Sequence, residues 1–259
     1  MTDQTSKPPG GRTGFGRLWA WGAAALALAL VVTAGLLVYH KTMDARLLKA
    51  DADLTVNDPV LTKYAVSLAK PAYGDNCARC HGADMKGGAA RGVPDLTDSV
   101  WLFDNGTAAD IERTILFGIR ADNRKSRNIT DMPAMGRQGN LGPGDVADVM
   151  TFMDSLQGKK VADLDAVARG KKVFADKGVC YDCHFDDAKG NSGYGAPDLT
   201  DNEWVYGGDR AAVLSSIMNG RHGVCPAFFD KLKPATIRGL AVYIYAISHK
   251  AGGVAPPHA

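Results

Sequence analysis

Cys77-Ala78-Arg79-Cys80-His81 and Cys180-Tyr181-Asp182-Cys183-His184 are the two stretches that decide the fold of this 259-residue chain. In each stretch, two thiols on one helical turn can form thioethers with the vinyl groups of a haem, and the following His lies under the iron as an axial ligand. The sequence therefore predicts two covalently bound haem c groups. Their expected attachment residues are Cys77, Cys80, Cys180 and Cys183, and their expected iron ligands on this side are His81 and His184.

Other uses of paired cysteines fit this pattern less well. A structural zinc site needs four ligands, whereas each pair here brings two Cys and one His. A thioredoxin-like dithiol needs a βαβ context, and strand signals are few in this chain. The fifth cysteine, Cys225, stands alone, so the cysteines do not read as a spread-out disulfide framework.

The two motifs belong to an internal duplication. Cys77 and Cys180 are 103 residues apart. The same offset relates two further pairs of landmarks, Pro94-Asp95-Leu96-Thr97 with Pro197-Asp198-Leu199-Thr200, and Trp101 with Trp204. Three landmarks in register indicate two copies of one domain.

The loop after each motif supplies a candidate partner for the ligating His. Pro94 and Pro197 each lie 13 residues beyond the His of their copy. A metal-bound His usually donates its other ring N–H to an oxygen, which fixes the orientation of the ring. We therefore expect the backbone carbonyls of Pro94 and Pro197 to be these acceptors.

Each copy reads as a small helical domain, so the fold class is all-α. Asn57-Asp58-Pro59 and Asp163-Leu164 are helix starts, and each copy closes with an amphipathic helix whose apolar stripe we interpret as packing. Gln157-Gly158-Lys159-Lys160 reads as a linker. The expected division is a linker at 40–56, cytochrome c domains at 57–157 and 163–250, and a flexible tail at 251–259.

The second iron ligand of each haem has to come from further along the chain. In the first copy, Asp131-Met132-Pro133-Ala134-Met135 offers two methionines. We favour Met132, because Met-Pro-Ala has a counterpart in the second copy, and interpret Met135 as a loop or core residue. Thioether ligation raises the reduction potential, which suits an electron carrier.

That counterpart is Cys225-Pro226-Ala227, with Cys in the place of Met. A bound thiolate is anionic and favours ferric iron, so Cys225 as a ligand would lower the potential of its haem. Three alternatives stay open: ligation by His222, ligation by Met218, and a position open to water or a small ligand. Cys225 would then be only a small buried apolar residue.

An uncharged stretch of 22 residues, Leu18 to Tyr39, precedes the two copies. At 1.5 Å per residue it is about 33 Å long, enough to cross a hydrocarbon core of ~30 Å. A cleavable signal peptide would have a shorter apolar core of about 7–15 residues followed by a small-residue site. Here the apolar run continues past Ala34 and Gly35, which favours a retained transmembrane helix at 18–39.

The charges around this helix predict its orientation. Before it, Lys7, Arg12 and Arg17 outnumber the single Asp3, whereas the charges after it cancel. The positive side stays inside, so we expect residues 1–17 in the cytoplasm and the haem domains in the periplasm of a bacterial inner membrane. Over the whole chain, 30 basic residues balance 28 acidic ones, which gives no indication of nucleic-acid binding.

An ordered set of motifs around these landmarks is similar to a known family. The matching segments include Asn57-Asp58-Pro59-Val60-Leu61, Phe117-Gly118-Ile119-Arg120, Met132-Pro133-Ala134-Met135-Gly136-Arg137, Trp204-Val205-Tyr206-Gly207-Gly208 and Asn219-Gly220-Arg221. The chain resembles FixP/CcoP, the dihaem, membrane-anchored subunit III of cbb3-type cytochrome c oxidases. The resemblance implies an anchor followed by two tandem class I cytochrome c domains.

The resemblance also implies a function and partners. The chain would relay electrons from a donor cytochrome c to the monohaem c subunit and then to the haem b and copper subunit, without oxygen chemistry of its own. The family's ligands carry over as His81 with Met132, and His184 with the position of Cys225, where the family has Met. The alternatives are an anchored dihaem shuttle for another periplasmic oxidoreductase, a Cys-ligated dihaem enzyme acting on sulfur compounds, and a gas sensor.

Overall fold

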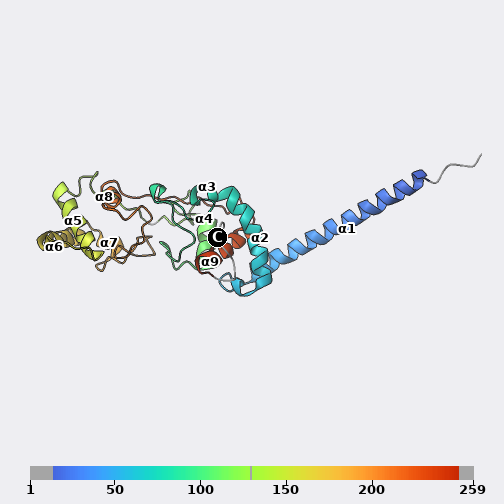
Figure 1. Ribbon diagram of the computed structural model, residues 1–259, viewed down its shortest axis with the longest axis horizontal. Helices are drawn as coiled ribbons and strands as arrows, with labels where there is room; N and C mark the ends of the chain where they lie inside the picture. Colours follow the sequence, from blue (N-terminus) through green and yellow to red (C-terminus); the bar gives the residue numbers. More distant parts are fainter. Residues whose placement is uncertain (1–13, 129, 251–259) are drawn as a thin grey trace, which may run out of the picture. The chain divides into compact units, whose positions relative to one another are not determined.

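The computed structural model describes residues 14–128 and 130–250, and these residues are mostly helical. In this part of the chain no named strand forms, and only isolated β-bridges occur. The helices are α1 (Gly14–Lys49), α2 (Pro59–Asn76), α3 (Ala78–His81), α4 (Ala108–Phe117), α5 (Pro143–Leu156), α6 (Leu164–Ala175), α7 (Tyr181–His184), α8 (Arg210–Asn219) and α9 (Pro234–Ser248), with two 3-10 turns, η1 (Thr55–Asn57) and η2 (Ala89–Arg91) (Figure 1).

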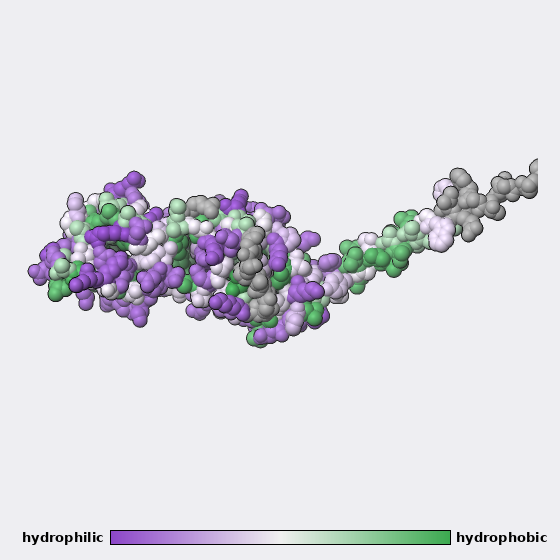
Figure 2. All heavy atoms as spheres, viewed as in Figure 1, coloured by the Kyte–Doolittle hydropathy of each residue, from purple (hydrophilic) through white to green (hydrophobic). Residues whose placement is uncertain are grey.

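Helix α1 is the candidate membrane anchor. Its segment Trp19–Lys49 is the one helix among the described residues that is long and apolar enough to cross a membrane, and its side chains up to Tyr39 are exposed. Figure 2 shows the apolar residues along this helix. The predicted span at 18–39 lies within α1. Residues 1–13 of the predicted cytoplasmic segment and the predicted tail at 251–259 lie outside the described residues.

The expected helix starts are confirmed. Helix α2 begins at Pro59, and the Asp58 side chain accepts hydrogen bonds from the backbone N–H groups of Val60 and Leu61. Helix α6 begins at Leu164 and is capped in the same way by Asp163. Such N-caps satisfy backbone donors that have no partner within the helix.

The helices pack across the boundary between the two sequence copies. The last helix of the chain, α9, lies on α2 and α4, which belong to the first copy, whereas α5 lies on α6 and α8 of the second copy (Figure 1). We call α2, α3, α4 and α9 the α2/α9 half, and α5, α6, α7 and α8 the α5/α6 half. The expected domains at 57–157 and 163–250 follow the repeat, but each packed half takes its closing helix from the other copy.

A short connection explains this exchange. Only residues 157–163 join α5 to α6. Helices joined by so few residues fold back on one another as antiparallel neighbours. Because the apolar face of α5 then packs on α6, it is not available to α2. The equivalent helix of the second copy, α9, packs on α2 in its place.

Both helix crossings are close and apolar. A Cβ on Gly170 of α6 would collide with the Asp148 backbone of α5, and a Cβ on Gly239 of α9 would collide with the Ala65 backbone of α2. The stripes expected to pack are buried, with Val149 and Met150 in α5 and Leu240 and Ala241 in α9. Each crossing therefore forms part of a separate apolar core.

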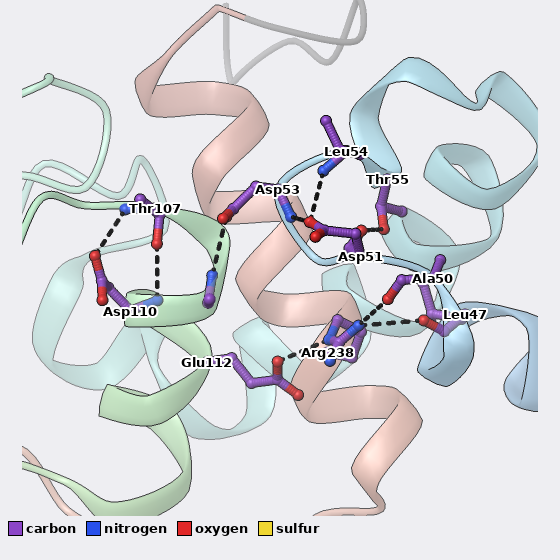
Figure 3. A network of polar contacts seen from close by, with 11 residues as sticks. Leu47, Ala50, Asp51, Asp53, Leu54, Thr55, Thr107, Asp110, Glu112 and Arg238 are labelled. Carbon is purple, nitrogen blue, oxygen red and sulfur yellow. Dashed lines mark hydrogen bonds and ion pairs between the residues drawn. The ribbon is translucent and has the colours of Figure 1, made fainter.

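Arg238 on α9 joins α9 to α4 and to the C-terminal end of α1 through hydrogen bonds (Figure 3). Arg238 Nε donates to Glu112 Oε2 of α4 at 2.7 Å, and both side chains are mostly buried. Arg238 Nη1 also donates to the backbone carbonyls of Leu47 and Ala50, at 3.3 and 2.8 Å. Helix α9 thereby donates hydrogen bonds to two carbonyls at the C-terminal end of α1, where backbone carbonyls lack partners within the helix.

Candidate haem sites

Each CxxCH motif forms one short helical turn that orients its His. Nδ1 of His81 lies 3.2 Å from the Pro94 carbonyl oxygen, and Nδ1 of His184 lies 3.0 Å from that of Pro197. The carbonyls of Pro94 and Pro197 thus lie at the positions predicted from the spacing of 13 residues. With Nδ1–H donating to the carbonyl, Nε2 is left as the metal-binding nitrogen.

Burial favours the uncharged form of the His184 imidazole and of the first thiol of each motif. Burial lowers the pKa of His184, and the hydrogen bond to Pro197 opposes this effect only in part. The neutral ring is the form that binds a metal. Burial also raises the pKa of Cys77 and of Cys180 to about 11. Of the second cysteines, Cys80 is exposed and Cys183 is half-buried.

Cys225 lies in the α2/α9 half, beside the first motif. Its backbone pairs with Ile119 just after α4, with N–H to O distances of 2.9 and 3.0 Å in the two directions. The thiol is buried close to Cys77 and Cys80, and burial, assisted by Cys80, raises its pKa to about 11. A thiol with this pKa becomes a thiolate at neutral pH only by binding a metal.

Met132 lies in the α5/α6 half, beside the second motif. Its backbone pairs with Arg221 just after α8, at 2.9 and 3.2 Å. Its side chain packs against the apolar cluster that Cys180 also contacts. The sequence analysis paired Met132 with His81 and Cys225 with His184, whereas in the structure Met132 packs in the half of the second motif and Cys225 in the half of the first. The reason is that each Xaa-Pro-Ala segment pairs with the backbone after the fourth helix of the other copy.

Two glycines permit these reciprocal backbone pairs. Gly118 has a φ of 72° and Gly220 a φ of 68°, a region that other residues rarely adopt. A Cβ on Gly118 would collide with the Cys225 carbonyl, and a Cβ on Gly220 would collide with the Met132 carbonyl. The two glycines hold equivalent places in the two copies, so the exchange follows the same rule on both sides.

The other candidate ligands have different surroundings. Met135 is buried in the α5/α6 core, where its Sδ lies 3.9 Å from Asn140 Nδ2. Met218 lies against Gly136 at the edge of the same core. His222 is 57% exposed and its Nδ1 lies 2.7 Å from Asp131 Oδ2, so its ring is engaged by a surface carboxylate.

The residues present fit a c-type haem in both halves. Two thiols and an oriented imidazole adjoin an apolar core in each half, and a further sulfur lies beside each motif. In the α2/α9 half, Trp101 Nε1 is buried and has no hydrogen-bond partner among the described residues. A buried indole N–H normally has a partner, and a haem propionate is an acceptor of suitable chemistry.

Sequence reasoning missed two aromatic rings, Phe103 and Tyr206, each of which packs against a loop of the other copy. A Cβ on Gly92 would collide with the ring of Tyr206, and a Cβ on Gly195 with the ring of Phe103. The backbone also connects the two loops, where Asp104 N donates to Ser192 O at 3.2 Å. Phe103 and Tyr206 each stand two residues after a repeat-marking Trp, so their equivalence was the available signal.

Comparisons with known proteins identify both copies of the repeat as cytochrome c domains. The family described as cytochrome c matches residues 66–157, and the family described as cytochrome c oxidase, cbb3-type, subunit III matches residues 165–244. The cbb3-type cytochrome c oxidase subunit FixP of Bradyrhizobium sp. (strain ORS 278) is 40% identical over 190 residues, which are 73% of this chain and 63% of the relative. The chain thus spans less than two thirds of that relative's length.

Two CcoP subunits are matched over more of their length. The cbb3-type cytochrome c oxidase subunit CcoP of Azospirillum sp. (strain B510) is 38% identical over 249 residues, covering 87% of this chain and 81% of the relative. That of Cereibacter sphaeroides is 34% identical over 210 residues, covering 80% and 70%. Both cytochrome c domains are of the type that carries covalently bound haem c. The chain belongs to the FixP/CcoP family, subunit III of cbb3-type cytochrome c oxidases.

Proposed function

We propose that the chain is an anchored dihaem relay that passes electrons from a donor cytochrome c to the monohaem c and haem b/copper subunits of a cbb3-type oxidase. The observation that carries this proposal is the reciprocal construction of two haem-type sites inside one compact unit, residues 47–259. A unit with two such sites, each completed by the other copy, suits transfer between two fixed redox centres. The names of the relatives indicate the kind of complex that it serves.

Membrane anchoring is supported by helix α1 together with membership of this family. We further propose that the haem sites lie on the periplasmic side of the inner membrane. The excess of positive charge before α1, in Lys7, Arg12 and Arg17, supports this orientation.

The attachment residues and iron ligands are assigned from the packing. Cys77 and Cys80 would hold one haem and Cys180 and Cys183 the other, each by two thioethers. We assign His81 and Cys225 as the ligands of the first iron, and His184 and Met132 as those of the second. The backbone pairs of Cys225 with Ile119 and of Met132 with Arg221 support this assignment. Each haem supplies a one-electron iron couple when bound.

The two ligand sets give the sites different properties. The Cys225 thiol would release its proton on binding, and the anionic sulfur would favour ferric iron. Met132 brings a neutral thioether, which favours ferrous iron. The site at His81 should therefore have the lower potential. This is the reverse of the order that the resemblance implies, in which the position of Cys225 belongs to the second motif.

Purification of the tagged full chain from its own membranes tests the relay. We expect co-purification with a monohaem c subunit and a copper-containing haem b subunit, and reduction of both haems of the chain before the haem b subunit when a donor cytochrome c is added. Isolation of a dihaem chain without the copper-containing subunit would contradict the oxidase assignment. That result would favour a shuttle for another oxidoreductase.

A further inference from the structure

The surface edge formed by the second motif differs from the edge formed by the first motif in its exposed residues. Helices α3 and α7 are equivalent turns of four residues, and the positions following both are also equivalent. Tyr181 and Phe185 of the second motif are 40% and 49% exposed. Their counterparts in the first motif are Ala78 and Gly82.

Core packing does not account for these two aromatic side chains. Phe185 has a φ of 58° and a ψ of 172°, in a region favoured by glycine, and its counterpart Gly82 adopts a similar conformation with a φ of 81°. Phenylalanine is thus unfavourable for the backbone at this position. Because Phe185 is 49% exposed, burial does not offset that cost.

Negative charge surrounds the same edge. Asp182 and Asp186 are exposed, and their counterparts in the first motif are Arg79 and Ala83. The negative charge of Asp182 and its hydrogen bond with Tyr181 raise the pKa of the Tyr181 phenol, and Asp186 adds a smaller effect in the same direction. Among the described residues, no salt bridge neutralises Asp182 or Asp186, whereas the neighbouring Lys172 and Lys177 are paired with Asp176 and Asp145.

We propose that Tyr181 and Phe185, rimmed by Asp182 and Asp186, form the docking surface for a small single-haem cytochrome c with a basic face. The proposal rests on the relay function and names where its donor binds. An apolar centre with a charged rim is the usual composition of a specific interface. Opposite charge on the partner speeds encounter and orients the two haem edges toward each other.

The binding rate of a basic cytochrome tests this surface. The full chain with both haems, in detergent, would be immobilised, and mitochondrial cytochrome c would be the probe. We compare it with a Tyr181→Ala, Asp182→Arg, Phe185→Gly, Asp186→Ala variant, which copies the edge of the first motif. The control is Leu164→Ala with Asp165→Arg, which changes an exposed apolar residue and an exposed carboxylate at the first turn of α6.

We expect the association rate constant of the fourfold variant to fall by about tenfold or more at low salt, with a weaker salt dependence, and the control to change less than about twofold. Cytochrome c with succinylated lysines should bind the unchanged chain as poorly. Haem content and both midpoint potentials should be retained. If the fourfold variant loses haem, Asp182→Arg with Asp186→Ala replaces it, because both side chains are exposed.

Unchanged binding by the variant, or an equal loss in the control, would overturn the docking surface. Failure of the unchanged chain to bind the basic probe would overturn it as well. Neither result touches the relay, which is tested by co-purification with the oxidase subunits. A chain that co-purifies with the oxidase but does not use this surface would place donor docking elsewhere.

Discussion

The α2/α9 half and the α5/α6 half are built by the same rules but close over their motifs with different sulfur atoms. In both halves a Pro carbonyl orients the His, and a glycine with positive φ allows the Cys225 or the Met132 segment to approach. In both halves the closing helix, α9 or α5, comes from the other copy. Cys225 then lies beside the first motif and Met132 beside the second. One duplicated backbone thus places chemically different sulfur atoms, a thiol and a thioether, beside its two equivalent motifs.

Cys225→Met should give both halves a methionine sulfur beside the motif, and of these changes it should have the largest effect, on the reduction potential of one haem. Replacing an anionic thiolate by a neutral thioether should raise the potential of the haem at the first motif by roughly a few hundred millivolts. A redox titration followed by visible spectroscopy would measure the change. Met132→Cys is the reciprocal variant and should lower the potential of the other haem. If Cys225→Met moves the haem at the second motif instead, the assignment of the halves is wrong.

Leu240→Ala should destabilise the α2/α9 half more than the α5/α6 half. Leu240 of α9 is fully buried in the α2/α9 core, so its truncation should cost about 2–5 kcal/mol. We expect a lower denaturation midpoint and an earlier spectral change at the haem of the first motif, although Leu240 belongs to the second sequence copy. Leu214→Ala, at a 40% exposed position of α8, is the control and should stay within about 0.5 kcal/mol. An earlier change at the second motif would speak against the exchanged helix.

Glu112→Gln should weaken the α2/α9 half by a smaller amount. The change removes the charge that faces Arg238, and both side chains are mostly buried, so we expect a loss of about 1–3 kcal/mol. Denaturant unfolding would measure it. Asp176→Asn breaks the exposed pair with Lys172 in the other half and should change the stability much less, because solvent screens this pair. Equal losses in the two variants would mean that Arg238 does not tie α9 to α4.

The smallest effect should be the pH dependence of the stability that the α5–α6 contact contributes. Arg169 of α6 donates two hydrogen bonds to Asp148 of α5, at 2.8 and 2.9 Å, and these lower the pKa of the carboxyl group despite an opposing effect of burial. Because the folded pKa lies below the unfolded one, the contribution is present above the ordinary aspartate pKa of about 3.9 and is lost as the pH falls through the folded value.

Asp148→Asn isolates this contribution. Stability measured against pH should differ between the variant and the unchanged chain at neutral pH, and the two curves should converge in acid. Parallel curves would show that the pair contributes no pH-dependent stability, and would remove one support for the α5–α6 contact.

The local features of this protein could be predicted from the sequence, and the exchange between copies could not. The motif turns, the helix starts at Asp58 and Asp163 and the Pro94 and Pro197 acceptors depend on residues close together in the chain. The choice of closing helix is a competition between α5 and α9, which are equivalent in the repeat and both amphipathic. Nothing in either apolar stripe identifies its partner.

The length of the connection between α5 and α6 was the available signal. A connection at 157–163 reads equally well as a linker between domains and as a tight turn between helices. The identities of Met132 and Cys225 as candidate ligands were open to sequence reasoning, because their segments repeat. Their assignment to the opposite motifs required the packing, since the pairs with Arg221 and Ile119 join residues far apart in the chain.

The EPR spectrum of a one-haem variant, Cys180→Ser with Cys183→Ser, tests the reciprocal assignment most directly. In this variant only the first motif can bind haem covalently, while Met132 and Cys225 are both retained. We expect the remaining ferric haem to have a thiolate-type signal and a low potential. A methionine-type signal with a high potential would show that Met132 serves the first motif, and would contradict the exchange of ligands between the two copies.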